Sequence, residues 1–203
     1  MLRDILAHAR VYSLYSRLIG AKRGLHIYLE RYIRPRVGDR ILDIGCGPAD
    51  ILGALPMVEY HGFDLSADYI ESARRRFGNR GHFHVEAVNA ELVKKYAGFD
   101  LVLATGILHH LTDAEAGDLF RVAKAALKPG GRLVTLDGCF VEGQSPIARY
   151  LLTKDRGQFV RNEAAYVALA RQVFSEVSPV ITTALVRIPF THLIMECHRE
   201  PAP

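Results

Sequence analysis

From residue 40 onward, short apolar runs alternate with stretches in which apolar residues recur at spacings of three and four. The first pattern is typical of buried strands, and the second of helices that pack one face against a core. Strands are predicted at 41–44, 59–63, 81–87, 100–104, 132–137, 179–186 and 191–198. Helices are predicted at 66–77, from 112 to about 127, and at 162–174. This alternation predicts an α/β fold with a doubly wound, mostly parallel seven-stranded sheet that ends in an antiparallel hairpin.

Local signals fix the boundaries of the helix that begins near residue 112. Thr112 and Glu115 have the spacing of a capping box, which opens a helix. Pro129-Gly130-Gly131 ends this helix and turns the chain into the next strand. The stretch from 138 to 161 shows no regular period, so no element is predicted there.

Size and composition indicate an ordinary globular chain. A length of 203 residues is typical of one domain, and we expect residues 1–203 to form one. The net charge is only +4 and no RNP-like aromatic pattern is present, so no dedicated nucleic-acid module is expected. Cys46, Cys139 and Cys197 form no CxxC pair, which fits a reducing cytoplasm better than a disulfide scaffold. No apolar run approaches the length of a membrane span.

The first predicted strand runs directly into Gly45-Cys46-Gly47. Gly45 permits a tight turn, and Gly47 allows a ligand to approach the backbone closely. Pro48 suits the first position of a helix, so a strand, a glycine loop and a helix are expected in succession. Ligands of such sheets bind at the carboxyl ends of the strands, where this loop lies.

Acidic residues near the loop indicate which ligand it takes. A dinucleotide places its pyrophosphate at a helix N-terminus, and the GxGxxG pattern would need glycine where this chain has Asp50. S-adenosylmethionine carries two cationic groups against one carboxylate, so Asp43 at the strand end would attract it. Asp64 lies 21 positions after Asp43, where an acid can bind ribose hydroxyls, and Leu65 beside it could cover an adenine ring. For Asp50 we expect only a role at a helix terminus.

Four segments together resemble the class I S-adenosylmethionine-dependent methyltransferases, of the small bacterial kind with a type 11 or 12 methyltransferase domain. These segments are LDIGCG (42–47), GFDLS (62–66), FDLVLATGILHHL (99–111) and LKPGGRLV (127–134). They follow the family's order and spacing over residues 39–137. The resemblance implies a Rossmann-like methyltransferase fold with S-adenosyl-L-methionine as cofactor and S-adenosyl-L-homocysteine as product. It divides the chain into a cofactor-binding half at 37–137 and a substrate-side half at 138–203.

The resemblance also implies roles for individual residues. The implied cofactor contacts are Asp43, Gly45, Cys46, Gly47, Asp64, Leu65, Asn89, Ala90 and Ala104. Asn89 replaces an acid that the family often uses for the adenine amino group, and its side-chain oxygen can still accept that hydrogen bond. Ala104 ends the fourth strand, where backbone carbonyls of the family meet the amino group of the cofactor. Ala49 replaces a third glycine of the common GCGxG form.

Candidate residues for catalysis and for the methyl acceptor are fewer. Methyl transfer is an in-line displacement, for which the protein supplies position and removes a proton. His110 is the candidate general base because imidazole titrates near neutral pH, and His109 is a candidate acceptor contact. The alternative for both is that they shape the loop. Arg156 and Arg161 are candidate contacts for an anionic or hydroxylated acceptor, unless they belong to a surface loop ahead of a helix.

An apolar stripe precedes the sheet, so residues 1–36 are expected to form an N-terminal helical segment. The stripe consists of Val11, Leu14, Leu18, Leu25, Tyr28 and Tyr32, with a break near Gly20. We expect this segment to lie over the cofactor as a lid, with Tyr12 and Tyr15 in one wall of the acceptor pocket. The alternative is that it packs on the outer helices of the sheet, far from the site.

Three functions are open at this point. The expected function is methyl transfer to a small-molecule or carbohydrate-linked acceptor, because the segment after the fourth strand, ATGILHHL, lacks the Asn/Asp-Pro-Pro-Tyr/Phe motif of amino-group methylation. A non-catalytic cofactor-binding partner or scaffold subunit is the alternative. An NAD(P)-dependent oxidoreductase is less favoured because of Asp43 and Asp50. His82 and His84 have no evident third ligand, so no metal site is expected.

Overall fold

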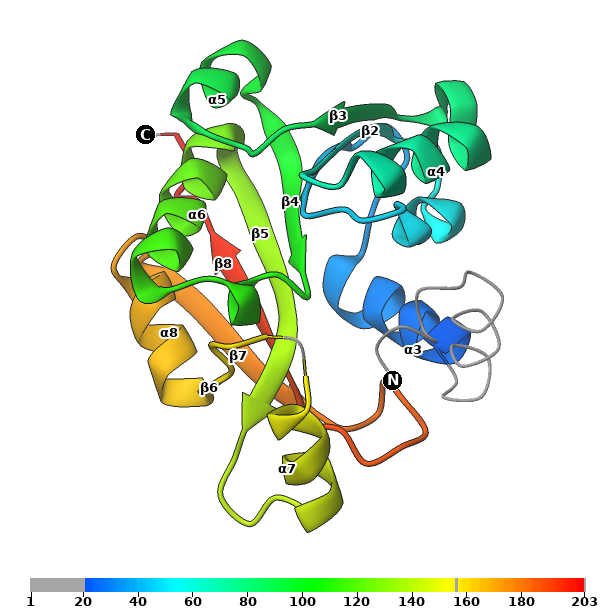
Figure 1. Cartoon of the computed structure of the whole chain (residues 1–203). Coiled ribbons are helices and arrows are strands. Elements are labelled where there is room, and N and C mark those ends of the chain that lie inside the picture. Colours follow the sequence, from blue (N-terminus) through cyan, green and yellow to red (C-terminus); the bar gives the residue numbers. More distant parts are fainter. Residues whose placement is uncertain (1–20, 156, 203) are drawn as a thin grey trace.

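A computed structural model describes residues 21–155 and 157–202. It has one twisted sheet with helices on both faces (Figure 1). The strands are β1 (Arg40–Ile44), β2 (Glu59–Asp64), β3 (His82–Val85), β4 (Phe99–Thr105), β5 (Leu127–Phe140), β6 (Arg161–Asn162), β7 (Glu176–Thr182) and β8 (His192–His198). The α-helices are α3 (Ala21–Tyr28), α4 (Ala67–Phe77), α5 (Ala90–Tyr96), α6 (Asp113–Ala126), α7 (Pro146–Thr153) and α8 (Glu163–Arg171). Shorter helical turns are η1 (Leu29–Ile33), η2 (Asp50–Ala54), η3 (Gly78–Arg80) and η4 (Leu108–His110).

The strand order is β3-β2-β1-β4-β5-β8-β7, with the two-residue β6 paired to β5. Strands β1 to β5 run parallel, whereas β8 is antiparallel to both β5 and β7. The order reverses between β1 and β4, which is the switch point where such sheets bind ligands. The predicted doubly wound sheet and its C-terminal hairpin are therefore confirmed.

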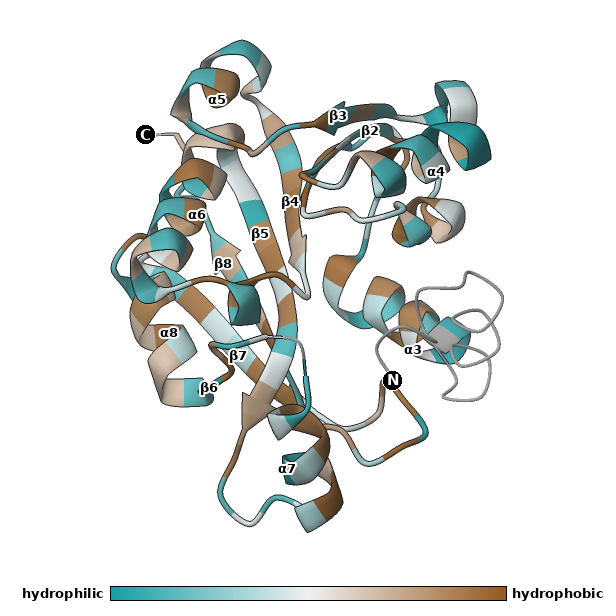
Figure 2. Cartoon of the chain, in the orientation of Figure 1, coloured by the Kyte–Doolittle hydropathy of each residue, from teal (hydrophilic) through white to brown (hydrophobic). Residues whose placement is uncertain are grey.

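Two apolar cores lie on opposite faces of the sheet, because the helices cover both faces. Helices α5, α6 and α8 cover one core, and α3, η1, η2 and α4 cover the other. β4 serves both, since Val102 faces the first core while Leu101 and Leu103 face the second. The mainly brown colour of β4 in Figure 2, broken by one hydrophilic band near its start, agrees with this double burial.

The helix starts predicted at Ser66, Thr112 and Asn162 are confirmed. Thr112 Oγ1 accepts the backbone N–H of Glu115, and the Glu115 carboxylate accepts the backbone N–H of Thr112 at 2.8 Å, which completes the capping box. Ser66 caps α4, and Asn162 caps α8 by accepting the N–H of Ala165 at 2.9 Å.

Predictions for the second half of the chain were less accurate. The stretch 138–161 contains α7 and the first residue of β6, although no element was predicted there. β7 covers 176–182 instead of 179–186 and includes Pro179. Proline is tolerated because β7 is the edge strand, where a missing N–H costs no ladder bond on the open side.

The segment before β1 packs against the sheet. Of the predicted stripe, Tyr28 is buried in the same core as Ile41 and Leu103, and Leu25 and Tyr32 pack against that core. The Tyr28 hydroxyl lies 3.3 Å from Thr105 Oγ1, so this part of the stripe packs on the sheet itself and reaches the carboxyl end of β4. Tyr12, Tyr15 and Gly20 lie outside the described residues, so the lid stays a prediction, as does the division at residues 36 and 137.

Two further findings concern the described residues as a whole. Across 21–155 and 157–202, no helix combines the length and the apolar character needed to cross a bilayer. Cys46, Cys139 and Cys197 are free thiols, and the cytoplasmic location stays a prediction.

The contact between α3 and the β7–β8 loop gives a test of the fold. A Cβ at Gly24 would lie 1.8 Å from the backbone oxygen of Leu185, so Gly24→Ala must displace α3 or the loop. We expect the free energy of unfolding to fall by about 1–3 kcal/mol in urea denaturation.

The matched control is Gly117→Ala, in the middle of α6. Its Cβ would meet only the Arg121 guanidinium, at 3.5 Å. This variant should gain up to about 1 kcal/mol from helix propensity. Equal stability of Gly24→Ala and the wild type would contradict the described position of α3.

Candidate functional site

The glycine loop connects β1 to the helical turn η2 at the carboxyl edge of the sheet. Gly45 and Gly47 have φ of 72° and 55°, in the region that favours glycine. The N–H groups of Gly45 and Cys46 both donate to the carbonyl of Phe63, at 2.8 and 3.0 Å, which fastens the loop to β2. A Cβ at Gly47 would meet nothing within 4 Å, so this backbone borders open space where a ligand can approach.

The helix expected to begin at Pro48 is not present. Ala49 adopts a left-handed conformation with φ of 55°, and only the short 3₁₀ turn η2 follows. Ala49 thus keeps the conformation that a third glycine would favour, at a cost of about 1–2 kcal/mol, while its methyl group is fully buried. Asp50 is the first residue of η2, as expected for a helix-terminus acid, and it also forms an ion pair with Arg76 of α4 that supports the loop from outside.

Asp43 is a buried carboxylate at the end of β1, only 4% exposed. The hydroxyl of Tyr60 on β2 donates to its Oδ2 at 2.6 Å. Burial raises the pKa of Asp43 to about 7; the bond from Tyr60 opposes this rise and the charge of Asp64 adds to it. Tyr60 was not predicted as a site residue, since the sequence reads it as a core position of β2.

Asp64 closes the loop from the end of β2. Its Oδ2 accepts the N–H of Gly47 at 2.9 Å, and its Oδ1 accepts the N–H of Ser66 at 2.8 Å. Each carboxylate oxygen keeps further acceptor capacity, so Asp64 can hold the loop and still bind a ligand hydroxyl. The structure therefore brings Asp43, Gly47 and Asp64 together at one point, as the sequence predicted.

The remaining predicted cofactor residues surround this point in different ways. Leu65 is 76% exposed, an unusual position for leucine that leaves an apolar surface beside Asp64. The thiol of Cys46 packs against Gly62, so Cys46 offers a ligand its backbone. Asn89 Oδ1 accepts the N–H of Leu92 at 2.9 Å as the N-cap of α5, which begins at Ala90. Ala104 is the penultimate residue of β4 and fully buried. Their proposed cofactor contacts stay predictions.

A buried imidazole joins three segments at the end of β4. His109 Nδ1 lies 2.7 Å from Asp137 Oδ1 on β5, and His109 Nε2 lies 3.3 Å from Asp155 Oδ1 beyond α7. Burial by itself would lower the pKa of His109, but the bonds to Asp137 and Asp155 outweigh it and raise this pKa to about 9. His109 is therefore a cation at neutral pH, held between two acids.

The loop after α7 packs directly on His109. The N–H of Phe159 donates to the carbonyl of His109 at 2.9 Å, and a Cβ at Gly157 would lie 2.0 Å from the His109 ring. Asp137 was not predicted as a site residue, although it ends an apolar strand just as Asp43 does, and that signal could have found it.

The other predicted substrate and catalytic residues differ in position. His110 is exposed, and its ring centroid lies 4.2 Å from that of His109. Arg161 donates to the carbonyls of Leu108 and Leu111 at 3.0 and 2.7 Å, and to the Asp113 carboxylate. Arg161 thus holds the turn after β4 in place. Its guanidinium has few N–H groups left to bind a methyl acceptor. Arg156 lies outside the described residues.

The described residues hold no group of three or more metal-binding side chains arranged around a common point. His61, His82 and His84 do gather on β2 and β3. Their contacts are ring stacking, with centroids 4.7 Å apart for His61 and His82.

Comparison with known proteins agrees with this geometry. A family model described as a methyltransferase domain matches residues 42–133. The 27-O-demethylrifamycin SV methyltransferase of Amycolatopsis mediterranei (strain S699) is 37% identical over 110 residues, which is 50% of this chain and 39% of that protein. A ubiquinone biosynthesis O-methyltransferase of Xylella fastidiosa (strain 9a5c) is 33% identical over 110 residues, or 50% of this chain and 44% of that protein. The matches thus span less than half the length of these curated relatives.

Solved structures share the fold at low sequence identity. The S-adenosylmethionine-dependent methyltransferase SibL, in its apo form, superposes with a TM-score of 0.72 at 20% identity, over 97% of this chain and 61% of SibL. A TehB-like SAM-dependent methyltransferase from Corynebacterium glutamicum has a TM-score of 0.65 at 18% identity, over 95% of this chain and 99% of its own. The family match and the shared fold cover the same strands, so residues 42–133 are similar to a methyltransferase domain and the chain has the fold of these solved S-adenosylmethionine-dependent methyltransferases.

Proposed function

We propose that this chain binds S-adenosylmethionine at the carboxyl ends of β1, β2 and β4 and transfers its methyl group to a small-molecule acceptor. The observation that carries the proposal is the open glycine loop held between two carboxylates, Asp43 and Asp64. A ligand at this loop meets open backbone at Gly47, a buried acid and a second acid within reach of hydroxyls.

The residues present fit the cofactor of the family. Its net positive charge suits a site with two carboxylates, because opposite charges attract most strongly where burial lowers the local dielectric. Asp64 has acceptor capacity left for ribose hydroxyls, and the exposed side chain of Leu65 offers an apolar surface to a purine ring. The open space at Gly47 gives the ligand room to contact the backbone.

The same features disfavour a nicotinamide dinucleotide. A pyrophosphate binds best at the N-terminus of an α-helix, where several N–H groups point toward it. Here the loop leads into the five-residue 3₁₀ turn η2, and Asp43, Asp50 and Asp64 all lie nearby. Three acids would repel a pyrophosphate.

For methyl transfer, the main task of the protein is to position the acceptor against the cofactor. The bound cofactor supplies an electrophilic methyl group on a good leaving group. The turn after β4 is held by Asp137 and Arg161, so it presents a rigid edge to an acceptor. His109 is a cation between two acids and is therefore a poor base at neutral pH. A base role for the exposed His110 remains part of this proposal.

The relatives' names support a hydroxyl acceptor, since two of them are named as O-methyltransferases or as acting on an O-demethyl compound. The competing possibility is a protein that binds the cofactor without catalysis. Transfer of a labelled methyl group to a panel of hydroxylated compounds separates the two. Binding of S-adenosylhomocysteine with no transfer across the panel would favour the non-catalytic alternative.

The role of Asp64 gives the first prediction. Asp64→Asn should weaken S-adenosylhomocysteine binding by about 1.5–3 kcal/mol in calorimetric titration, because hydrogen bonds to a charged acceptor are lost. Asp50→Asn is the matched control, since Asp50 lies in the same region but pairs with Arg76, and its affinity should stay near that of the wild type. Unchanged affinity in a folded Asp64→Asn protein would remove Asp64 from the site.

A pH dependence of binding follows from Asp43. Its pKa of about 7 in the free protein should fall when the ammonium group of the ligand binds nearby, because a cation favours the ionised carboxylate. Binding of S-adenosylhomocysteine should therefore release protons, and its affinity should fall as the pH drops from 8 to 6. Asp43→Asn should bind more weakly and without this slope. Equal wild-type affinities at both pH values would contradict a charged contact at Asp43.

A pH dependence of stability follows from His109. Because its folded pKa of about 9 exceeds the unfolded value near 6.5, its stabilising contribution is complete below pH 6.5 and is lost as the pH rises through 9. The free energy of unfolding should fall across this window by at most about 1.4 kcal/mol per pH unit relative to His109→Gln. His110, Asp137 and Asp155 are the charged or titratable neighbours. Parallel stability curves for the two proteins would show that His109 is not the titrating cation.

A further inference from the structure

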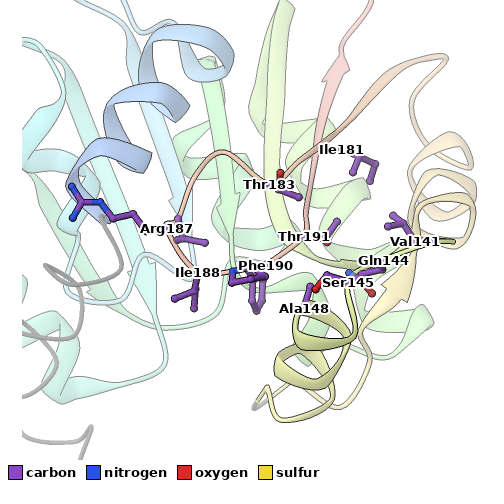
Figure 3. Close-up of a pocket in the computed structure, with 13 residues that line it drawn as sticks. Val141, Gln144, Ser145, Ala148, Ile181, Thr183, Arg187, Ile188, Phe190 and Thr191 are labelled. Carbon is purple, nitrogen blue, oxygen red and sulfur yellow. The ribbon is translucent and has the colours of Figure 1, made fainter.

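A pocket of about 480 Å³ lies just beyond the end of β5 (Figure 3). Its walls come from the chain between β5 and α7, the first turn of α7, and the β7–β8 loop. This volume falls within the range of about 300–1,000 Å³ that is usual for small-molecule sites. The residues that line it include Ala148, Ile181, Val186, Ile188 and Phe190.

The lining is apolar and nearly free of charge. Among the described residues that form the walls, Arg187 is the only charged one, and its guanidinium points away from the other labelled side chains in Figure 3. No carboxylate or ammonium in these walls would offset the cost of removing a charged ligand from water. The pocket therefore selects against charged molecules.

Polar groups are few and placed in one wall. Gln144 donates its Nε2 to the carbonyl of Cys139 at 3.0 Å, which fixes the orientation of the amide. Its Oε1 is then left buried without a partner, and the hydroxyl of Ser145 makes no capping bond to α7. The Gln144 Oε1 is closed to solvent, but the exposed hydroxyl of Ser145 can accept a hydrogen bond, so this wall favours a ligand that carries a donor.

The pocket lies further along the sheet than the glycine loop. The strand registers place the end of β1 level with Thr135, and β5 continues to Phe140, so with a rise of about 3.3 Å per residue and a strand spacing of about 4.8 Å the ends of β1 and β5 are roughly 19 Å from each other. The end of β4 is level with Leu136 and is nearer, roughly 14 Å from the end of β5. An elongated ligand that extends from the pocket along β5 can thus bring one end to a methyl group held near β4.

We infer that this pocket binds the methyl acceptor, and that the acceptor is an uncharged, mainly apolar small molecule with a hydroxyl or another hydrogen-bond donor. The inference rests on the proposed function for the acceptor role, but the ligand class follows from the pocket walls alone. Of the anionic or hydroxylated acceptor predicted from Arg156 and Arg161, it keeps the hydroxyl, because Arg161 is engaged by the turn after β4.

Four naphthalene probes of one shape test the ligand class by calorimetric titration at pH 7. 2-Naphthol is neutral and has a donor, 2-methoxynaphthalene lacks the donor, 2-naphthoate is an anion, and 2-naphthylmethylammonium is a cation. We expect 2-naphthol to bind at least tenfold more tightly than either ion, and several-fold more tightly than 2-methoxynaphthalene. Equal or tighter binding of either ion would overturn the uncharged class, and equal binding of the ether would overturn the donor.

A charge-introducing variant locates the binding site. Thr183→Lys adds a cation at an exposed residue of the pocket wall, so it should lower the affinity for 2-naphthol and raise that for 2-naphthoate. Val180→Lys adds the same charge on β7 outside the pocket, at a side chain 41% exposed, and should change neither affinity. A gain in naphthoate binding cannot come from unfolding. The same shift in both variants, or in neither, would place the probe elsewhere and refute the pocket assignment.

S-adenosylhomocysteine is titrated into the same wild-type protein, which keeps the two proposals distinguishable. If it binds and 2-naphthol does not, the pocket inference fails while the proposed function stands. If 2-naphthol binds and S-adenosylhomocysteine does not, the proposed function fails and the acceptor role fails with it. Thr183→Lys should leave the affinity for S-adenosylhomocysteine unchanged, because Thr183 lines the pocket beyond β5 and is not among the residues proposed to contact the cofactor.

Discussion

The buried cation His109 connects the parts of this protein that must stay in register for a reaction at the sheet edge. Its imidazole joins the turn after β4 to Asp137 on β5 and to Asp155 beyond α7. Removing a charge from water is expensive, and here two carboxylates and tight packing by Gly157 offset that cost. The main effect of these contacts is to fix the turn after β4, the end of β5 and the loop after α7 relative to one another. These three segments cannot move independently while the imidazole is charged.

The glycine loop is held by a second set of polar contacts, independent of His109. Asp43 accepts a hydrogen bond from the Tyr60 hydroxyl, and Asp64 accepts one from the Gly47 N–H. Both carboxylates are thus held in place and can still interact with a ligand. Ala49 keeps a left-handed backbone without glycine. Its fully buried methyl group gains roughly 0.8 kcal/mol, which offsets much of the strain and explains why the loop geometry survives the exchange.

The pocket beyond β5 depends on contacts that are remote in sequence. The β7–β8 loop forms one wall, and the backbone of Leu185 in this loop touches Gly24 of α3. The segment before β1 therefore influences the acceptor side through the loop it supports. This connection follows from packing on the sheet and needs no lid over the cofactor.

The sequence by itself determined the positions of β1, β2, β4 and β8, the capping box at Thr112, the cap at Ser66 and the meeting of Asp43, Gly47 and Asp64. These depend on local periodicity, short-range hydrogen bonds and the rule that parallel strands end at one edge, all of which the order of residues specifies. Tertiary structure decided the rest. The partners of His109 lie 28 and 46 positions away, at Asp137 and Asp155, and Arg161 reaches back 50 positions to Leu111. A 3₁₀ turn stands where a helix was expected at Pro48, and α7 formed where the sequence shows no regular period. In both places the stable backbone conformation depends on packing between segments that are distant in sequence.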